Sequence, residues 1–255
     1  MVNLPYMRLL IFLVIIAIFG LVLWLTGAVR LGKTLYLILR ITPYEQTVTG
    51  SPVILVVGDS TGYGTGAEVG KDSIAGLIGS DYSAYSVVNR SKNGRTIGEA
   101  VEEMKKLPSD ERYELIVLQM GSNDILQKRP LDVVRSDLSL LFAIALEHSD
   151  HVVMITCGNV GTASRFAGTK RALEYEQLTR LYREMVIPLA AESGVRYVDL
   201  FEEPGVDMFL REPKKYLSID GLHPSSAGYA YWYERLQPAL VSMLPRTPTT
   251  TPSNP

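Results

Sequence analysis

The chain has 255 residues, 47% of them apolar, which is enough to bury one large hydrophobic core with short appendages. Its formal net charge is -2 with acidic and basic residues interspersed, so we expect no nucleic acid partner. The single cysteine, Cys157, excludes an internal disulfide framework, and its apolar neighbours predict a core residue.

The amino-terminal segment is strongly apolar. No charged residue occurs between Arg8 and Arg30, and these roughly 21 positions would span about 31 Å as a helix. That length matches a bilayer core and exceeds the apolar stretch of a cleavable signal peptide. We therefore expect residues 1–29 to form an uncleaved single-pass membrane anchor, with a cleaved signal peptide and a buried core helix as alternatives. Arg8 precedes the span, whereas Arg30, Lys33 and Arg40 follow it, a bias too small to assign the side of the membrane.

Residues 30–51 join the anchor to the rest of the chain. The stretch VRLGKTLYLILR alternates cationic and apolar side chains, which suits a membrane-surface segment or a continuation of the anchor helix. The following TPYEQTVTGSP has two prolines, a glycine and no regular period, so it predicts a linker. At the other end of the chain, residues 245–255 are rich in proline and threonine, which predicts a disordered tail.

Between these segments, residues 52–244 alternate short β-branched runs with longer segments of helical period. The runs are PVILVVG, YSVVN, YELIVLQMG, HVVMITCG and VRYVDLF. One helical face carries Leu131, Val134, Leu138, Leu141 and Ala145, and a last helix begins near Ser226. This alternation predicts a three-layer α/β/α domain with a five-stranded, mostly parallel, flavodoxin-like sheet. Ligands of such sheets bind at the carboxyl ends of the strands.

Polar motifs follow three of the predicted strands, and a fourth motif lies near the end of the domain. They are GDSTGYGTG, NRSKNGRT and GSND after the first, second and third runs, and DGLHP at some distance after the fifth. Each motif alone is typical of a capped turn. Together they supply the groups of a hydrolytic site at the edge where this fold exposes ligands.

A nucleophile, a base and an orienting carboxylate can be assigned among these motifs. Ser60 offers a hydroxyl, which becomes nucleophilic when a neighbouring base takes its proton. His223 is the candidate base, because His148 and His151 flank a turn at the opposite end of the sheet, where we expect surface residues. Asp220 precedes His223 by three positions, so a turn would place both side chains on one face with the carboxylate accepting the Nδ1 proton.

A tetrahedral intermediate also needs hydrogen-bond donors for its oxyanion. The candidates are the backbone N–H groups of Ser60 and Gly94 and the side-chain amide of Asn123, which lie on three successive strand-end loops. Glycine suits the second position, because no Cβ obstructs the approach of a substrate to the main chain.

The order and content of these motifs resemble the SGNH hydrolases, the GDSL-type esterases and lipases, over roughly residues 52–243. The matching positions are Ser60 in GDS, Gly94 in KNGRT, Asn123 in GSND and His223 in DGLHP, and Thr61 takes the fourth position of the GDSL motif. The resemblance implies Ser60 as nucleophile, Asp220 and His223 as the remainder of a triad, and an oxyanion hole formed by Ser60, Gly94 and Asn123.

From these residues we expect a membrane-anchored serine hydrolase that cleaves lipid, acyl or acetyl-sugar esters without a metal or other cofactor. An acyltransferase of the same fold and a non-catalytic, membrane-tethered binding module are alternatives. A metal phosphoesterase is a further one, with Asp59, Asn123, Asp124 and His223 as ligands. Tyr63, Arg165 and Phe166 are candidates for substrate selectivity without an assigned role.

Overall fold

The computed structural model describes residues 4–245 and divides the chain into two compact units, Met1–Arg40 and Ile41–Pro255. Residues 246–255, which belong to the predicted disordered tail, lie outside the described range.

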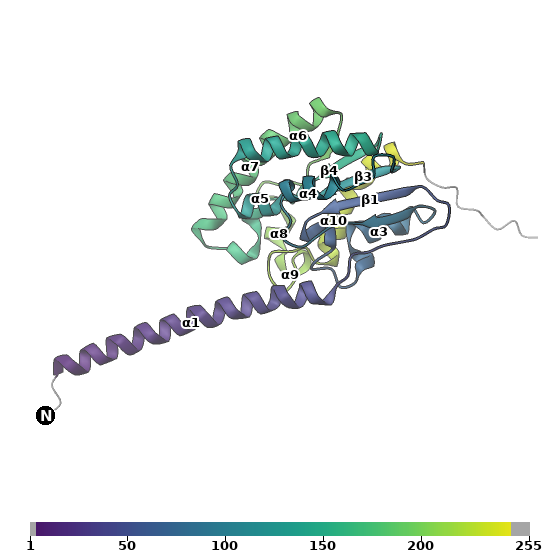
Figure 1. The fold of residues 1–255 in the computed structure, drawn as a ribbon. Coiled ribbons are helices and arrows are strands. Elements are labelled where there is room, and N and C mark those ends of the chain that lie inside the picture. The colour runs from purple at the N-terminus through teal and green to yellow at the C-terminus, as the bar shows by residue number, and fades with distance from the viewer. Residues whose placement is uncertain (1–3, 246–255) are drawn as a thin grey trace, which may run out of the picture. The chain divides into compact units, whose positions relative to one another are not determined.

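The described part of the first unit is one continuous helix, α1 (Leu4–Arg40), of 37 residues (Figure 1). Its stretch Ile11–Arg40 is long and apolar enough, by length and composition, to cross a membrane or to act as a signal sequence. The large apolar side chains of Phe12, Phe19 and Trp24 are each at least 60% exposed. Residues 30–40 continue the amino-terminal helix, which is one of the two interpretations of their sequence.

The second unit is built on a five-stranded parallel sheet with the strand order β2-β1-β3-β4-β5. The strands are β1 (Val53–Gly58), β2 (Ser86–Asn89), β3 (Leu115–Gln119), β4 (Val152–Ile155) and β5 (Arg196–Val198). Every residue of β3 and β4 is buried, as expected for strands covered on both faces. The predicted α/β class, the strand number and the flavodoxin-like order are confirmed.

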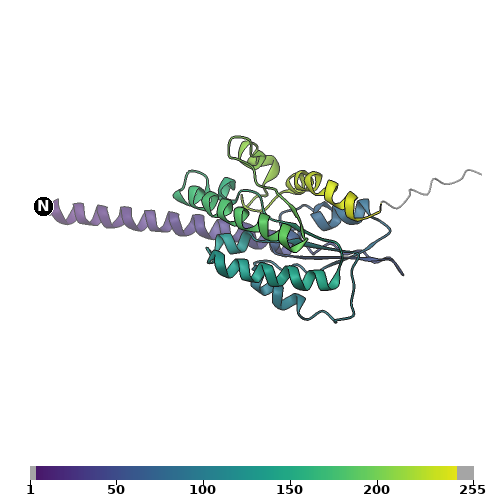
Figure 2. The ribbon, with the colours of Figure 1, turned by 90° about the horizontal axis from the view of Figure 1, so that it is seen from above.

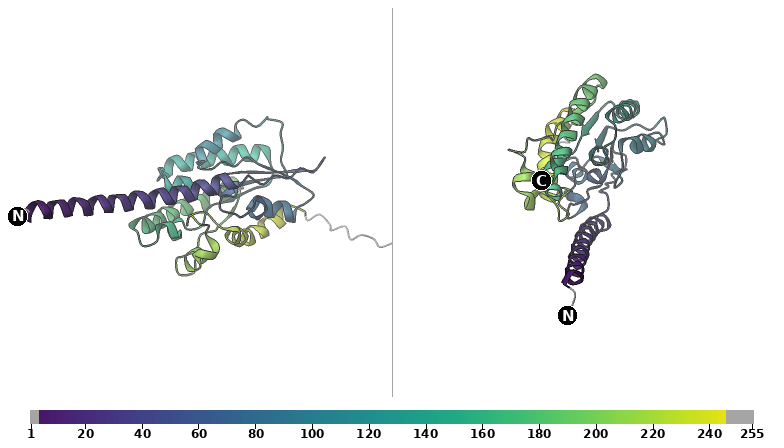
Figure 3. Two further views of the ribbon diagram at one scale, coloured as in Figure 1. Left: turned by 90° about the horizontal axis from the view of Figure 1, so that it is seen from below. Right: turned by 90° about the vertical axis from the view of Figure 1, so that its left-hand side faces the viewer.

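Helices cover both faces of this sheet, as Figures 1 and 2 show and as the view from below in the left panel of Figure 3 repeats. One face packs against α4 (Ile97–Met104), α6 (Leu131–His148) and α7 (Lys170–Ser193). The other packs against α3 (Ile74–Asp81) and α10 (Ser226–Met243). Cys157, just after β4, is partly buried and contacts both apolar cores.

Short helical turns occupy several loops of the unit. They are α2 (Ser60–Tyr63), η1 (Gly70–Asp72), α5 (Ser122–Leu126), η2 (Val160–Thr162), η3 (Ser164–Phe166), α8 (Met208–Arg211) and α9 (Pro213–Tyr216). Two of them, α2 and α5, directly follow β1 and β3. Because all five strands are parallel, these turns lie at the same edge of the sheet, where the polar motifs were expected to gather.

Residues 41–51, which the sequence predicts as part of a linker, pack on the edge strand β2. Gln46 forms an antiparallel bridge with Val87, and its side-chain amide donates to the carbonyl of Tyr85 at 2.8 Å. The backbone N–H of Val48 donates to Oγ of Ser86 at 2.9 Å. An edge strand presents unpaired backbone groups, and this segment forms hydrogen bonds with some of them. A search of the sequence for apolar periods does not detect such contacts.

Candidate active site

Ser60 lies on a tight turn between β1 and α2. Asp59 caps this helix, because its Oδ1 accepts hydrogen bonds from the backbone N–H and the hydroxyl of Thr61, both at 2.8 Å. Gly58 lets the turn approach β3 closely, since a Cβ at this position would lie 2.4 Å from the carbonyl oxygen of Gln119. The turn therefore holds the Ser60 hydroxyl at the carboxyl end of β1.

Ser60, His223 and Asp220 form a continuous chain of polar contacts. Nε2 of His223 lies 3.0 Å from Oγ of Ser60, and Nδ1 of the same ring lies 2.8 Å from Oδ2 of Asp220. All three residues are buried, with exposed fractions of 8% for Ser60, 7% for His223 and 6% for Asp220. Bulk water therefore screens these contacts weakly. The structure thus brings together the three groups that the sequence singled out, across 163 positions of chain between Ser60 and His223.

The carboxylate of Asp220 is held by donors on both oxygens. Its Oδ1 accepts from the Ser218 hydroxyl at 2.9 Å and from the backbone N–H groups of Leu222 at 2.9 Å and His223 at 3.1 Å. Burial alone would raise the pKa of Asp220, but the hydrogen bond and charge of His223 and the two backbone donors lower it below its usual value. Asp220 is therefore an anion in the folded protein at neutral pH.

The three candidate oxyanion donors have N–H groups to offer. Nδ2 of Asn123 donates one hydrogen to the carbonyl of Arg95 at 3.1 Å, and an amide nitrogen carries two. Within residues 4–245, no hydrogen bond uses the backbone N–H of Ser60 or of Gly94. Gly94 is exposed and has φ of +80°, whereas a Cβ there would meet no atom within 4 Å. Its backbone conformation favours glycine, and the open space around this position leaves the main chain accessible.

A buried contact that sequence reasoning missed joins the serine turn to the Asn123 loop. The hydroxyl of Ser122 donates to Oδ2 of Asp59 at 2.5 Å. Burial raises the pKa of Asp59 above its usual value, although the hydrogen bonds from Ser122 and Thr61 oppose the shift. The only sequence signal was adjacency, because Asp59 and Ser122 each precede a candidate site residue.

A second missed feature is Gly66, in the loop after α2. Its φ is +102°, and a Cβ there would lie 2.2 Å from the carbonyl oxygen of Pro224 and 2.9 Å from Cβ of His223. Glycine therefore allows this loop to pack against the backbone that carries His223. The repeated glycines of GDSTGYGTG were the available signal.

Two other polar residues, His148 and Asp124, make hydrogen bonds inside the fold. His148 is buried and its Nδ1 lies 2.7 Å from the carbonyl of Glu111, so the prediction of a surface residue was wrong, whereas His151 is partly exposed. Asp124, a ligand in the metal alternative, instead accepts hydrogen bonds from the backbone N–H of Ile97 and from Arg129. Across the described part of the chain, no cluster of three or more His, Cys, Asp or Glu side chains is arranged to hold a metal ion.

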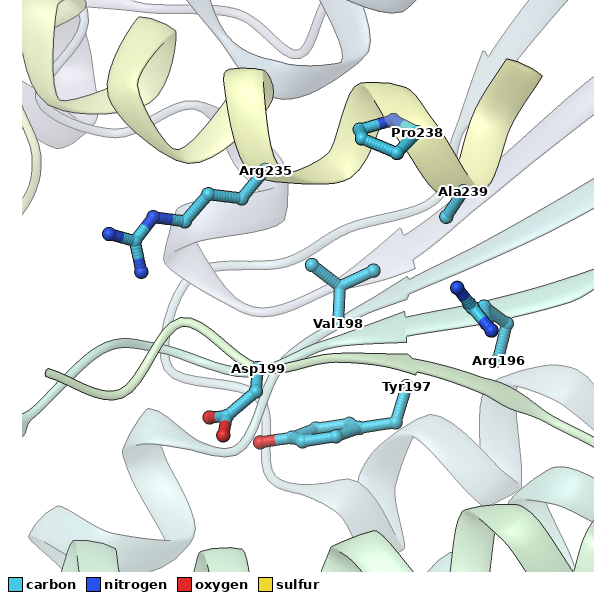
Figure 4. A pocket seen from close by; sticks show the side chains of 7 residues that line it. All are labelled: Arg196, Tyr197, Val198, Asp199, Arg235, Pro238 and Ala239. Carbon is cyan, nitrogen blue, oxygen red and sulfur yellow. The ribbon is translucent and has the colours of Figure 1, made fainter. Parts of the chain in front are cut away.

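Pockets occur both beside the candidate site and away from it. One, of about 560 Å³, includes Gly94 and Arg95 and extends along charged side chains of α4. The other, of about 380 Å³, lies between β5 and α10 (Figure 4). Its lining residues are Arg196, Tyr197, Val198, Asp199, Arg235, Pro238 and Ala239, none of them a predicted site residue.

The fold is that of several solved structures. A protein from Lactobacillus plantarum is 24% identical and superposes with a TM-score of 0.61, covering 78% of this chain and 100% of that one. TesA is 22% identical with a TM-score of 0.60, covering 75% and 99%. The esterase EstA from a Pseudoalteromonas species, solved inhibited by monoethylphosphonate, is 15% identical with a TM-score of 0.55, covering 75% and 98%.

Comparison with curated proteins gave no match. The model of the GDSL-like lipase/acylhydrolase family, however, matches residues 56–231. This range includes all the candidate site residues, and it begins in β1 and ends in α10. The chain belongs to the GDSL-like lipase/acylhydrolase family, which confirms the resemblance seen in its motifs.

Proposed function

We propose that this protein is a membrane-anchored serine hydrolase that cleaves carboxylic esters through an acyl-enzyme on Ser60. The observation that carries the proposal is the pair of contacts of the His223 ring, 3.0 Å to Oγ of Ser60 and 2.8 Å to Oδ2 of Asp220. Family membership supports the same reaction class. Water as the acyl acceptor makes the enzyme an esterase, and an alcohol acceptor would make it an acyltransferase.

The geometry suits a two-step reaction. Nε2 of His223 accepts the proton of Ser60 while Oγ attacks the ester carbonyl, and the imidazolium is stabilised by the buried carboxylate of Asp220. The same proton then passes to the departing alcohol. Water, activated by His223, hydrolyses the acyl-enzyme in the second step and regenerates the serine.

The oxyanion of each tetrahedral intermediate would be stabilised by N–H groups. In the proposal these belong to the backbone of Ser60, the backbone of Gly94 and the amide of Asn123. Asn123 is oriented by its bond to the carbonyl of Arg95, one residue after Gly94, so the loops after β2 and β3 are aligned with each other.

The amino-terminal helix would hold the enzyme on a membrane. In this proposal residues 1–29 form the anchor, and residues 52–244 form the hydrolase domain together with the segment 41–51 that packs on β2. The exposed apolar side chains of α1 support an anchor, because they would cost free energy in water.

A panel of p-nitrophenyl esters of rising acyl length, assayed with the full chain in detergent, tests this function. We expect hydrolysis that is lost in Ser60→Ala and retained in Ser80→Ala, which removes an exposed hydroxyl of α3. The dependence on chain length would distinguish an acetyl esterase from a lipase or a thioesterase-like enzyme. Hydrolysis of equal rate in Ser60→Ala would refute the assignment.

A further inference from the structure

The turn η3, after β4, is fixed to the loop that carries Asp220. The backbone N–H of Arg165 donates to the carbonyl of Gly221 at 2.9 Å. Oγ of Ser164 lies 2.6 Å from the position that a Cβ on Gly221 would take, and Gly221 has φ of +69°. Glycine suits this position by its backbone conformation, and the backbone nitrogen of Arg165, 3.1 Å from that Cβ position, leaves little room for a side chain.

This packing places a guanidinium group beside the carboxylate of Asp220. Nη1 of Arg165 lies 4.0 Å from Oδ2 of Asp220, and the two side chains are 20% and 0% exposed. The same Oδ2 is the oxygen that lies 2.8 Å from Nδ1 of His223. One carboxylate oxygen thus faces both the ring that it orients and a permanently charged cation.

We propose that Arg165 is a positioning residue, which acts through Asp220 to keep His223 in its neutral, proton-accepting form at lower pH. The inference rests on the proposed function, because only a general base makes the charge state of this ring relevant to turnover. The carboxylate of Asp220 favours the imidazolium, and a cation on the same oxygen opposes it. Without the guanidinium, His223 would stay protonated up to a higher pH, and its neutral base form would appear only above that pH.

The other ionisable groups around the pair do not replace this cation. Asp59, from the serine turn, is a buried carboxylate that acts on His223 in the same direction as Asp220. Tyr229, from α10, is neutral, because burial raises the pKa of its phenol well above the usual value. Lys215, from α9, holds its ammonium 4.7 Å from the centre of a tyrosine ring. The ion pair with Arg165 brings a cation to the carboxylate of Asp220.

The pH dependence of kcat/KM for p-nitrophenyl acetate, measured with the full chain in detergent, tests the role of Arg165. We expect the rise in kcat/KM of Arg165→Gln to move to higher pH by about half a unit, whereas Arg165→Lys keeps the profile near that of the parent. Arg196→Gln is the matched control, since Arg196 begins β5 at the opposite end of the strand from the site. If Arg165→Gln loses activity without a shift of its profile, the residue is merely structural and the proposal is wrong.

A titration of the histidine rings by NMR gives a second readout that does not require turnover. The chain has three histidines, so the ring signals can be assigned by substitution, and His148 and His151 serve as internal references. Only the midpoint of the His223 signal should move upward in Arg165→Gln. An unmoved midpoint would overturn the role of Arg165 alone, whereas equal hydrolysis by the parent and Ser60→Ala would overturn the proposed function itself.

Discussion

The hydroxyl of Ser122 donates a hydrogen bond to Oδ2 of Asp59 at 2.5 Å, although 63 positions of sequence separate the two residues. Asp59 precedes the candidate nucleophile and Ser122 precedes the candidate oxyanion amide. The bond therefore fixes the distance between the loops after β1 and β3, on which the alignment of nucleophile and oxyanion donor depends.

The charge of Asp59 should lower stability at neutral pH. Its pKa in the folded state is raised by burial, so the ionised form costs stability above that pKa, and the cost is absent below the unfolded value of about 3.9. Asp59→Asn keeps an oxygen for the N–H of Thr61 and gains an N–H for Ser122. We expect a higher thermal midpoint than the parent at pH 7, with the gain vanishing below about pH 4. A gain that grows on acidification would contradict this sign.

Asn123→Ala should reduce kcat by about 10²- to 10³-fold with little change in KM, because the amide acts on charge that exists only in the transition state. Steady-state kinetics with a p-nitrophenyl ester measure both constants. Gln127→Ala, at the end of α5, is the control and should leave both unchanged. A change confined to KM would mean that Asn123 binds the ground state of the ester.

Gly66→Ala should impair both stability and turnover. The added Cβ would meet the carbonyl of Pro224 at 2.2 Å in a backbone with φ of +102°, so the loop that carries His223 must move. Gly194→Ala separates backbone strain from steric contact, because Gly194 has φ of +79° but an added Cβ would meet no atom within 4 Å. We expect that variant to lose about 1 kcal/mol of stability and keep its activity. Equal activity of the two variants would show that the contact at Gly66 does not position His223.

The amino-terminal helix should keep the full-length protein in the membrane fraction through high-salt and carbonate washes, because insertion of apolar surface is insensitive to charge screening. Immunoblotting of the washed fractions and mass spectrometry of the intact chain measure this. Recovery of a soluble form that begins near residue 28 would instead identify α1 as a cleaved signal sequence.

The fold could be predicted from local patterns because burial on both faces leaves a clear trace in the sequence. The runs that became β3 and β4 are almost wholly apolar, and the helical face from Leu131 to Ala145 falls within α6. Residues 41–51 could not be placed, because their contacts with β2 use backbone groups and polar side chains of no regular period. The burial of His148 was missed because its hydrogen-bond partner is a backbone carbonyl 37 positions away in the sequence.

The residue types of the site could be predicted from the sequence, whereas its geometry could not. Asp220 and His223 are close in sequence, so their contact follows from a turn. The approach of His223 to Ser60 depends on tertiary packing, including the space left at Gly66. The cation beside Asp220 comes from a loop whose sequence gives no distance information, which is why Arg165 had no role before the structure.

Covalent labelling by a fluorophosphonate tests most directly whether Ser60, His223 and Asp220 act as one catalytic unit. Intact-mass spectrometry of the full chain in detergent should show a single adduct, located on Ser60 by peptide mapping. The adduct should be absent in Ser60→Ala and form far more slowly in His223→Ala, and the double variant should hydrolyse esters barely more slowly than either single variant. Labelling and hydrolysis that are unchanged in His223→Ala would contradict the account.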